Sequence, residues 1–62
     1  MSAKAELLRL LRQSDTFISG EELSRQLGIT RAAVWKNMEL LREEGYTIES
    51  VTRKGYRLTG VP

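Results

Sequence analysis

The sequence of 62 residues contains no cysteine and no histidine. Without cysteine, the chain has no disulfide, thiolate chemistry or cysteine-bound zinc with which to reinforce a small core. Without cysteine or histidine, the usual nucleophile, general-base and metal-ligand groups cannot be assembled. Most of the acidic residues fall on the expected solvent faces of helices. We therefore expect no enzyme active site, no metal site and no cofactor site in this chain.

Long hydrophobic runs are also missing. The longest apolar run, residues 32–35, has four residues, whereas a membrane span needs roughly 18. The first residues include an early acidic side chain and no apolar stretch of signal-peptide length. These features predict a cytoplasmic protein that does not enter the membrane.

The length and the charge distribution predict one small domain with a locally basic surface. A single domain over residues 1–62 would bury only about 60% of the surface that its unfolded chain exposes. The net charge is +2, and residues 31–62 hold six basic residues against four acidic ones. The positive excess falls in two groups without acidic neighbours: Arg31 with Lys36, and Arg53 with Lys54 and Arg57.

The first expected element is an amphipathic helix over about residues 3–13. Four leucines in this segment follow the spacing of one helical face, and the charged residues fall largely outside that face. Residues 14–16 break the period. Phe17 and Ile18 then predict a brief extended segment that is buried at the edge of a sheet.

A second helix is expected over about residues 20–27. Ser19 and Glu22 fit a capping box, in which each side chain satisfies a free backbone N–H at the start of the helix. Gly28 follows the last apolar position of the helix. Because glycine readily adopts the left-handed conformation, Gly28 is a suitable helix end.

A third helix is expected over residues 31–44, with Thr30 as its N-cap and Gly45 as its stop. The connection between the second and third helices is too short for antiparallel packing and contains a glycine. Such turns favour helices that cross steeply, which predicts a helix-turn-helix over about residues 20–44. The expected core holds the leucines of the first helix together with Leu23, Leu27, Ile29, Val34, Met38, Leu41 and Leu58.

A β-hairpin, the wing, is expected over about residues 46–59. Apolar and polar residues alternate in 46–51, and the alternation returns in 56–58. The connection suits a type I turn over Arg53 and Lys54, followed by a glycine in the left-handed region as a bulge. The fold class is therefore α+β: a winged helix-turn-helix with three helices and a small antiparallel sheet.

The third helix and the wing tip are the candidate binding surfaces. With its apolar residues turned inward, the third helix presents Ala32, Lys36, Glu39 and Glu43 outward, with Arg31 and Trp35 on the flanks. The basic first two turns of the helix suit the major groove of double-stranded DNA, and the acidic end should lie away from the DNA. The candidate DNA-binding residues are Thr30, Arg31, Ala32, Trp35, Lys36, Arg53 and Lys54.

Some of these residues have alternative interpretations. The indole of Trp35 either covers the boundary between the third helix and the wing or donates its N–H to a phosphate. The basic residues of the wing either bind DNA or protect a sheet edge, and Arg57 has the further option of pairing with Glu49. A winged helix can also serve as a protein-interaction module, although the basic residues argue against this reading here.

Four segments in this order resemble the N-terminal domain of the bacterial biotin operon repressor family. They are residues 18–24, 27–36, 41–46 and 54–58, and the resemblance covers essentially residues 5–59. Relatives often have histidine and an aliphatic residue in place of Asn37 and Met38. They also often have a Pro-Gly pair where this chain has Thr52 and Arg53, so this chain adds a positive charge to the wing.

The resemblance implies the operator-binding domain of a repressor of biotin synthesis or uptake genes. In that family, a ligase domain forms biotinyl-adenylate, which promotes dimerisation on a palindromic operator. The adenylate-binding loop and catalytic lysine of that domain have no counterpart in these residues. The resemblance therefore implies a domain that is monomeric alone and a parent that dimerises through a missing C-terminal domain. A winged helix from another bacterial regulator is the alternative.

Overall fold

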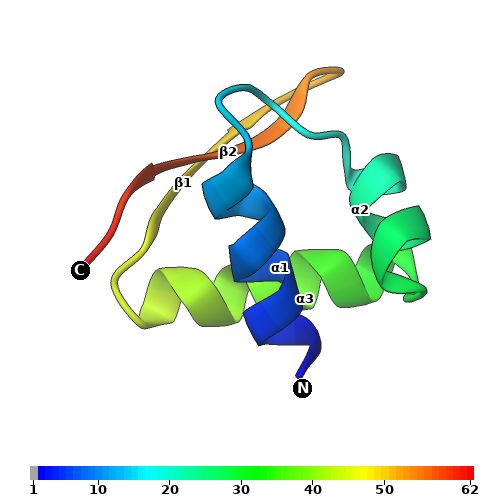
Figure 1. Cartoon of the computed structure of the whole chain (residues 1–62), viewed down its shortest axis with the longest axis horizontal. Coiled ribbons are helices and arrows are strands. Elements are labelled where there is room, and N and C mark those ends of the chain that lie inside the picture. The colour runs from blue at the N-terminus through cyan, green and yellow to red at the C-terminus, as the bar shows by residue number, and fades with distance from the viewer. Residues whose placement is uncertain (1) are drawn as a thin grey trace.

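The computed structural model describes residues 2–62, which form three helices followed by a two-stranded antiparallel hairpin (Figure 1). Helix α1 packs across α3, and α2 lies beside one end of α3. In the hairpin, β2 contacts α1 and β1 contacts α3. This arrangement confirms the expected winged helix-turn-helix. The elements are α1 (Ala3–Gln13), α2 (Gly20–Leu27), α3 (Arg31–Glu43), β1 (Thr47–Val51) and β2 (Gly55–Gly60).

Helix α1 has the expected bounds. Its N-cap is Ser2, whose hydroxyl oxygen accepts a hydrogen bond from the backbone N–H of Ala5 at 3.1 Å. This bond satisfies one of the donors that a helix leaves free at its start. Leu7 and Leu11, one turn apart, are buried, whereas the other two leucines of the helix are only partly buried. Half of the leucine face therefore forms the centre of the core.

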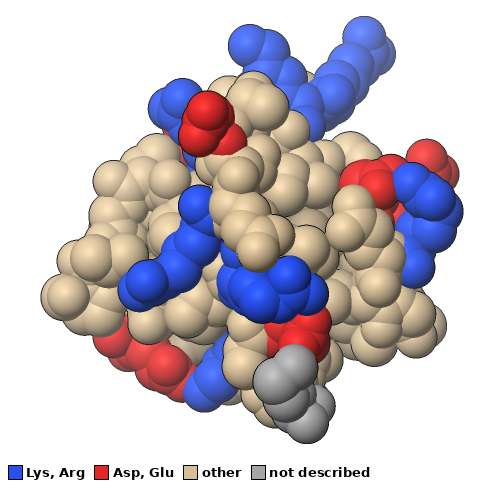
Figure 2. Space-filling view, viewed as in Figure 1, with Lys and Arg blue, Asp and Glu red and all other residues tan. Residues whose placement is uncertain are grey.

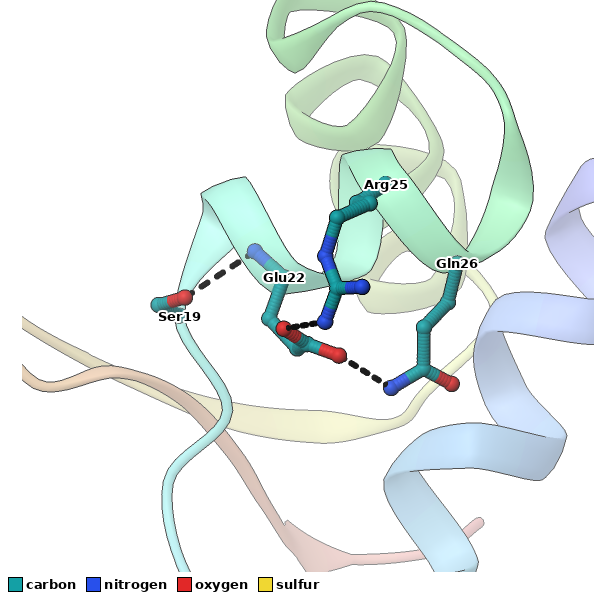
Figure 3. Close-up of polar contacts among 4 residues, drawn as sticks. All are labelled: Ser19, Glu22, Arg25 and Gln26. Carbon is teal, nitrogen blue, oxygen red and sulfur yellow. Dashed lines mark hydrogen bonds and ion pairs between the residues drawn. The ribbon is translucent and has the colours of Figure 1, made fainter.

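Helix α2 begins with only half of the expected capping box (Figure 3). Ser19 accepts a hydrogen bond from the backbone N–H of Glu22 at 3.0 Å, as predicted. The carboxylate of Glu22, however, accepts hydrogen bonds from Arg25 and, at 2.6 Å, from Gln26. These bonds, chiefly the one from Arg25, hold the pKa of Glu22 below its ordinary value. The reciprocal half of the box is a wrong prediction, because a charged donor one turn ahead attracts the carboxylate more strongly than a backbone N–H.

The chain changes direction between α2 and α3 through a tight turn. Gly28 adopts the predicted left-handed conformation, with φ +67°, and its N–H donates to the carbonyl oxygen of Ser24 at 2.9 Å. The hydroxyl of Ser24 donates in turn to the carbonyl oxygen of Ile29. Thr30 caps α3 by accepting a hydrogen bond from the N–H of Ala33 at 3.0 Å. These bonds fix the direction in which α3 leaves the turn.

Helix α3 ends one residue earlier than expected. Glu43 is its last residue, and Glu44 is the C-cap. Gly45 follows with φ +106°, a conformation that favours glycine, so its predicted role as the helix stop is confirmed. The backbone N–H of Tyr46 donates to the carbonyl oxygen of Leu41 at 3.1 Å, which closes the end of the helix.

All three helices and β1 contribute to one buried cluster. Leu27, Ile29 and Leu58 were expected in this core but are only partly buried, because a domain this small has few elements to cover its edges. Ile48 was not expected in the core, yet its side chain is only 6% exposed. The buried residues are Leu7, Leu11, Leu23, Val34, Met38, Leu41 and Ile48.

The hairpin is joined to the segment before α2 by one residue. The backbone N–H and carbonyl of Ile18 bond to the carbonyl and N–H of Tyr56, each at 2.9 Å. This bridge confirms the expected extended segment at the sheet edge, but Phe17 and Ile18 are only partly buried there. A Cβ on Gly55 would lie 2.1 Å from the carbonyl oxygen of Ile18, so the bridge requires glycine there. The first strand begins one residue later than expected, and the second is longer at both ends.

The wing turn differs from the expected type I turn over Arg53 and Lys54. Pairing of Val51 with Gly55 leaves three residues in the loop, and the N–H of Lys54 donates to the carbonyl oxygen of Val51 at 3.0 Å. Thr52 and Arg53 are therefore the central residues. Among the described residues, only Arg53 has a positive φ without being glycine, at +72°. That conformation fits the second central position of a type II turn, for which Pro-Gly is the favoured pair.

We expect Arg53→Gly to stabilise the folded domain by about 0.5–1 kcal/mol. A left-handed residue other than glycine costs roughly 1–2 kcal/mol, and the larger entropy of unfolded glycine offsets part of the gain. Lys54→Gly is the matched control, since Lys54 is not at positive φ and glycine there should lower stability. Urea denaturation of both variants measures the difference. Equal effects of the two substitutions would contradict the strain at Arg53.

Candidate nucleic-acid interface

The start of α3 presents the predicted face to solvent. Arg31, Ala32, Trp35 and Lys36 are exposed, whereas the buried residues of this helix lie on its other side. Thr30 is exposed as well. Its hydroxyl oxygen is held by the cap bond described above, which leaves the hydroxyl hydrogen available to a ligand. The structure therefore brings the predicted residues of α3 together within its first two turns.

Trp35 stands out from this face. Its side chain is 58% exposed, whereas a residue that covers the boundary between a helix and the wing would be largely buried. This exposure counts against the covering role, and contact of Trp35 with a ligand stays a prediction. The neighbouring Ala32 carries only a methyl group, so a ligand can approach the helix backbone closely at that position.

The second half of α3 is acidic on its outward side. Glu39 was expected to point outward, but it is partly buried and accepts a hydrogen bond from Arg42 at 2.6 Å. Arg42 also donates to the carbonyl oxygen of Ile48 at 2.8 Å, which draws the pair toward β1 and accounts for the difference. Glu43 is exposed, as predicted. The charge of Arg42 is thus neutralised within the domain, by Glu39.

The basic residues of the wing have different surroundings. Arg53 and Lys54 are exposed at the turn. Arg57 donates to its cross-strand partner Glu49 at 2.9 Å, so the pairing that the sequence left open is the one formed. The ring of Phe17 lies 5.6 Å from the ammonium of Lys54 and 5.0 Å from the guanidinium of Arg57, within cation–π range. Sequence reasoning gave Phe17 a place at the sheet edge but not this contact.

Half of the basic side chains are committed to ion pairs. Within the described residues, five of the ten pair with a carboxylate: Lys4, Arg9, Arg25, Arg42 and Arg57. Apart from Arg12, the cations without such a pair are those predicted to contact DNA, and we call them the four free cations: Arg31, Lys36, Arg53 and Lys54. Basic side chains project from the end of the molecule that carries the hairpin turn (Figure 2).

A hollow of about 410 Å³ lies between the starts of α2 and α3 and the wing. Arg31 lines it from α3, Arg53 from the wing, and Gly20 and Glu21 from α2. The sequence placed the two arginines in separate basic groups, and the structure brings them to one hollow. No local sequence signal predicts this proximity, because it depends on the bridge that joins the wing to the segment before α2.

The surface is suited to an anionic ligand. Unpaired guanidinium and ammonium groups bind phosphate oxygens, and a guanidinium can do so with two parallel hydrogen bonds.

Within the part of the chain that the structure describes, no cluster of three or more His, Cys, Asp or Glu side chains is suited to a metal ion. In the same residues, no helix has the length and apolar character of a membrane span.

Comparison with known proteins supports this reading. A family model described as an HTH domain matches residues 4–57. The chain is 50% identical over 60 residues to the bifunctional ligase/repressor BirA of Bacillus subtilis (strain 168), covering 95% of this chain and 18% of that protein. It is 42% identical over 53 residues to the protein of the same name from Escherichia coli (strain K12), covering 86% of this chain and 16% of that protein.

The chain thus spans less than a fifth of the length of these relatives. The matched part is their helix-turn-helix region and not their ligase catalytic domain. The resemblance to the N-terminal domain of biotin operon repressors is confirmed. The architecture and the match to the family model over nearly the whole length of the chain show that it belongs to the HTH domain family.

Proposed function

We propose that this chain binds double-stranded DNA as the operator-binding domain of a biotin-responsive transcriptional repressor. The observation that carries the proposal is the set of four free cations on the start of α3 and on the wing turn. The other basic side chains except Arg12 are neutralised by carboxylates of the domain itself. The name ligase/repressor of the relatives supports the same reading.

In this mechanism, the first two turns of α3 enter the major groove, where the edges of the bases differ. Lys36 and Ala32 lie on the outward side of those turns, so they approach the base edges. The wing turn carries Arg53 and Lys54 to the sugar–phosphate backbone or the adjacent minor groove. The acidic outward side of the second half of α3 remains away from the phosphates, which would repel it.

Biotin ligation and dimerisation would belong to the parts of the relatives that this chain does not match. A ligase domain would bind biotin and ATP and would bring two copies of the DNA-binding domain together on a palindrome. The 62-residue chain would itself be monomeric and would need no cofactor. Because bacterial operators lie on cytoplasmic DNA, the proposed function implies work in the cytoplasm.

Binding to any DNA duplex should depend strongly on salt. If the four free cations together neutralise about four phosphate charges, the logarithm of affinity falls with the logarithm of salt concentration at a slope of about −3.6. Fluorescence anisotropy of a labelled random-sequence duplex, titrated at several salt concentrations, measures the slope. Binding that is independent of salt would refute neutralisation of phosphates as the basis of affinity.

Substitutions on α3 and on the wing should have different effects on specificity. Lys36→Ala and Ala32→Glu should reduce the discrimination between a duplex selected in vitro by the chain and a random duplex, because α3 reads base edges. Arg53→Ala combined with Lys54→Ala should weaken binding to both duplexes, because phosphate contacts carry no sequence information. Equal losses on both duplexes for every variant would contradict this division.

The isolated chain should be a monomer that binds one half-site weakly and does not respond to biotin or ATP. The sequence offers no heptad repeat and no apolar stripe of the size that obligate dimers bury. Fusion to an unrelated dimerising module through a flexible linker should raise affinity for a palindrome by about 10²- to 10⁴-fold through effective concentration. A stable dimer of the chain in sedimentation, or biotin-dependent DNA binding by it, would contradict this proposal.

A further inference from the structure

Gly20, the first residue of α2, lies directly against the side chain of Arg31. A Cβ built on Gly20 would be 3.2 Å from Nε and 3.4 Å from Nη2 of Arg31, and 3.5 Å from Cε2 of Tyr56. Gly20 is buried, and its φ is not positive, so its backbone does not require glycine. An alanine here would displace the guanidinium by a few tenths of an ångström, and a larger residue would also crowd the ring of Tyr56.

The position of Arg31 on α3 makes this contact significant. Arg31 lies on the flank of the helix toward α2, whereas Lys36 lies on the outward side that faces a ligand directly. Arg31 lines the hollow from α3, with its guanidinium beside Gly20, and Arg53 lines it from the wing. Neither arginine forms an ion pair within the described residues. Glu21 is the one acidic residue that lines the hollow, so the charged residues lining it have a net positive charge.

We propose that Gly20 is a positioning residue for DNA binding: its missing side chain lets the guanidinium of Arg31 lie in the hollow, where Arg31 and Arg53 bind a backbone phosphate. This inference rests on the proposed function and deepens it. Arg31 then contacts the sugar–phosphate backbone of DNA, as the wing does, although it belongs to α3, the helix that enters the major groove. Reading of base edges is then left to the outward residues Ala32 and Lys36.

A double-mutant cycle tests the assignment. Arg31→Ala should weaken binding of the 62-residue chain to a random-sequence duplex by about tenfold at low salt, the loss expected for one charge-assisted hydrogen bond. It should also reduce the salt slope by about 0.9. Gly20→Ala should lose only a small part of that tenfold, because the guanidinium needs to move by only a few tenths of an ångström, and Gly20→Val should lose more. When Arg31 is already alanine, the Gly20 substitutions should have no further effect, because no guanidinium remains to be displaced.

Gly60→Ala is the matched control for Gly20→Ala. A Cβ on Gly60 would lie 3.3 Å from Oγ1 of Thr47, which is similar crowding, but Gly60 is outside the hollow. The Gly60→Ala variant should bind DNA with the same affinity as the unsubstituted chain. Nuclear Overhauser contacts between Gly20 Hα and the side chain of Arg31 provide a readout without DNA. They should be present in the free chain and weakened in Gly20→Val, while thermal unfolding verifies that each variant is folded.

Three results would contradict the inference or the proposed function on which it rests. Gly20 variants that bind as tightly as the unsubstituted chain, or that lose the same affinity with and without Arg31, would overturn the positioning role. Loss from Arg31→Ala on a selected duplex but not on a random duplex would overturn the assignment to the backbone. Failure of the unsubstituted chain to bind any duplex would refute the proposed function itself, which the other two results would leave intact.

Discussion

Burial of one side of α3 determines which of its residues face the solvent. Val34, Met38 and Leu41 are each no more than 1% exposed, in one cluster with leucines of α1 and α2. Full burial of such a side chain contributes about 1.5–3 kcal/mol, so rotation of α3 about its axis would expose side chains that stabilise the fold. Because that rotation is prevented, the outward position of Ala32 and Lys36 is fixed by residues that never contact a ligand.

The helices were predictable from the sequence because their ends are specified locally. Ser19, Gly28 and Thr30 act within a few residues of their own positions, and the structure places each in the expected conformation. The wing turn was not predictable in this way. Its geometry follows from the strand register, in which Val51 pairs with Gly55 and leaves three residues in the loop. Arg53 has a positive φ at the second central position of that turn, and a sequence with arginine there does not signal the conformation that Pro-Gly would.

The charges show the same division between local and long-range information. The basic groups of the candidate site are visible in the sequence, but the sequence does not say which cations are already paired. Arg42 and Arg57 are removed from the set of available cations by Glu39 and Glu49. Arg31, in contrast, gains a neighbour in the hollow that no spacing rule reveals. The site is therefore defined by which charges the fold leaves free, as much as by which charges the sequence contains.

If the start of α3 and the wing turn together form the DNA-binding surface, DNA should perturb the backbone at both places. Titration of a ¹⁵N-labelled chain with a short DNA duplex, followed by backbone amide chemical shifts, measures this. We expect the largest shifts in the first two turns of α3, at the wing turn and at the start of α2, while α1 and the acidic end of α3 change little. Shifts confined to α1 or to the acidic end of α3 would contradict it.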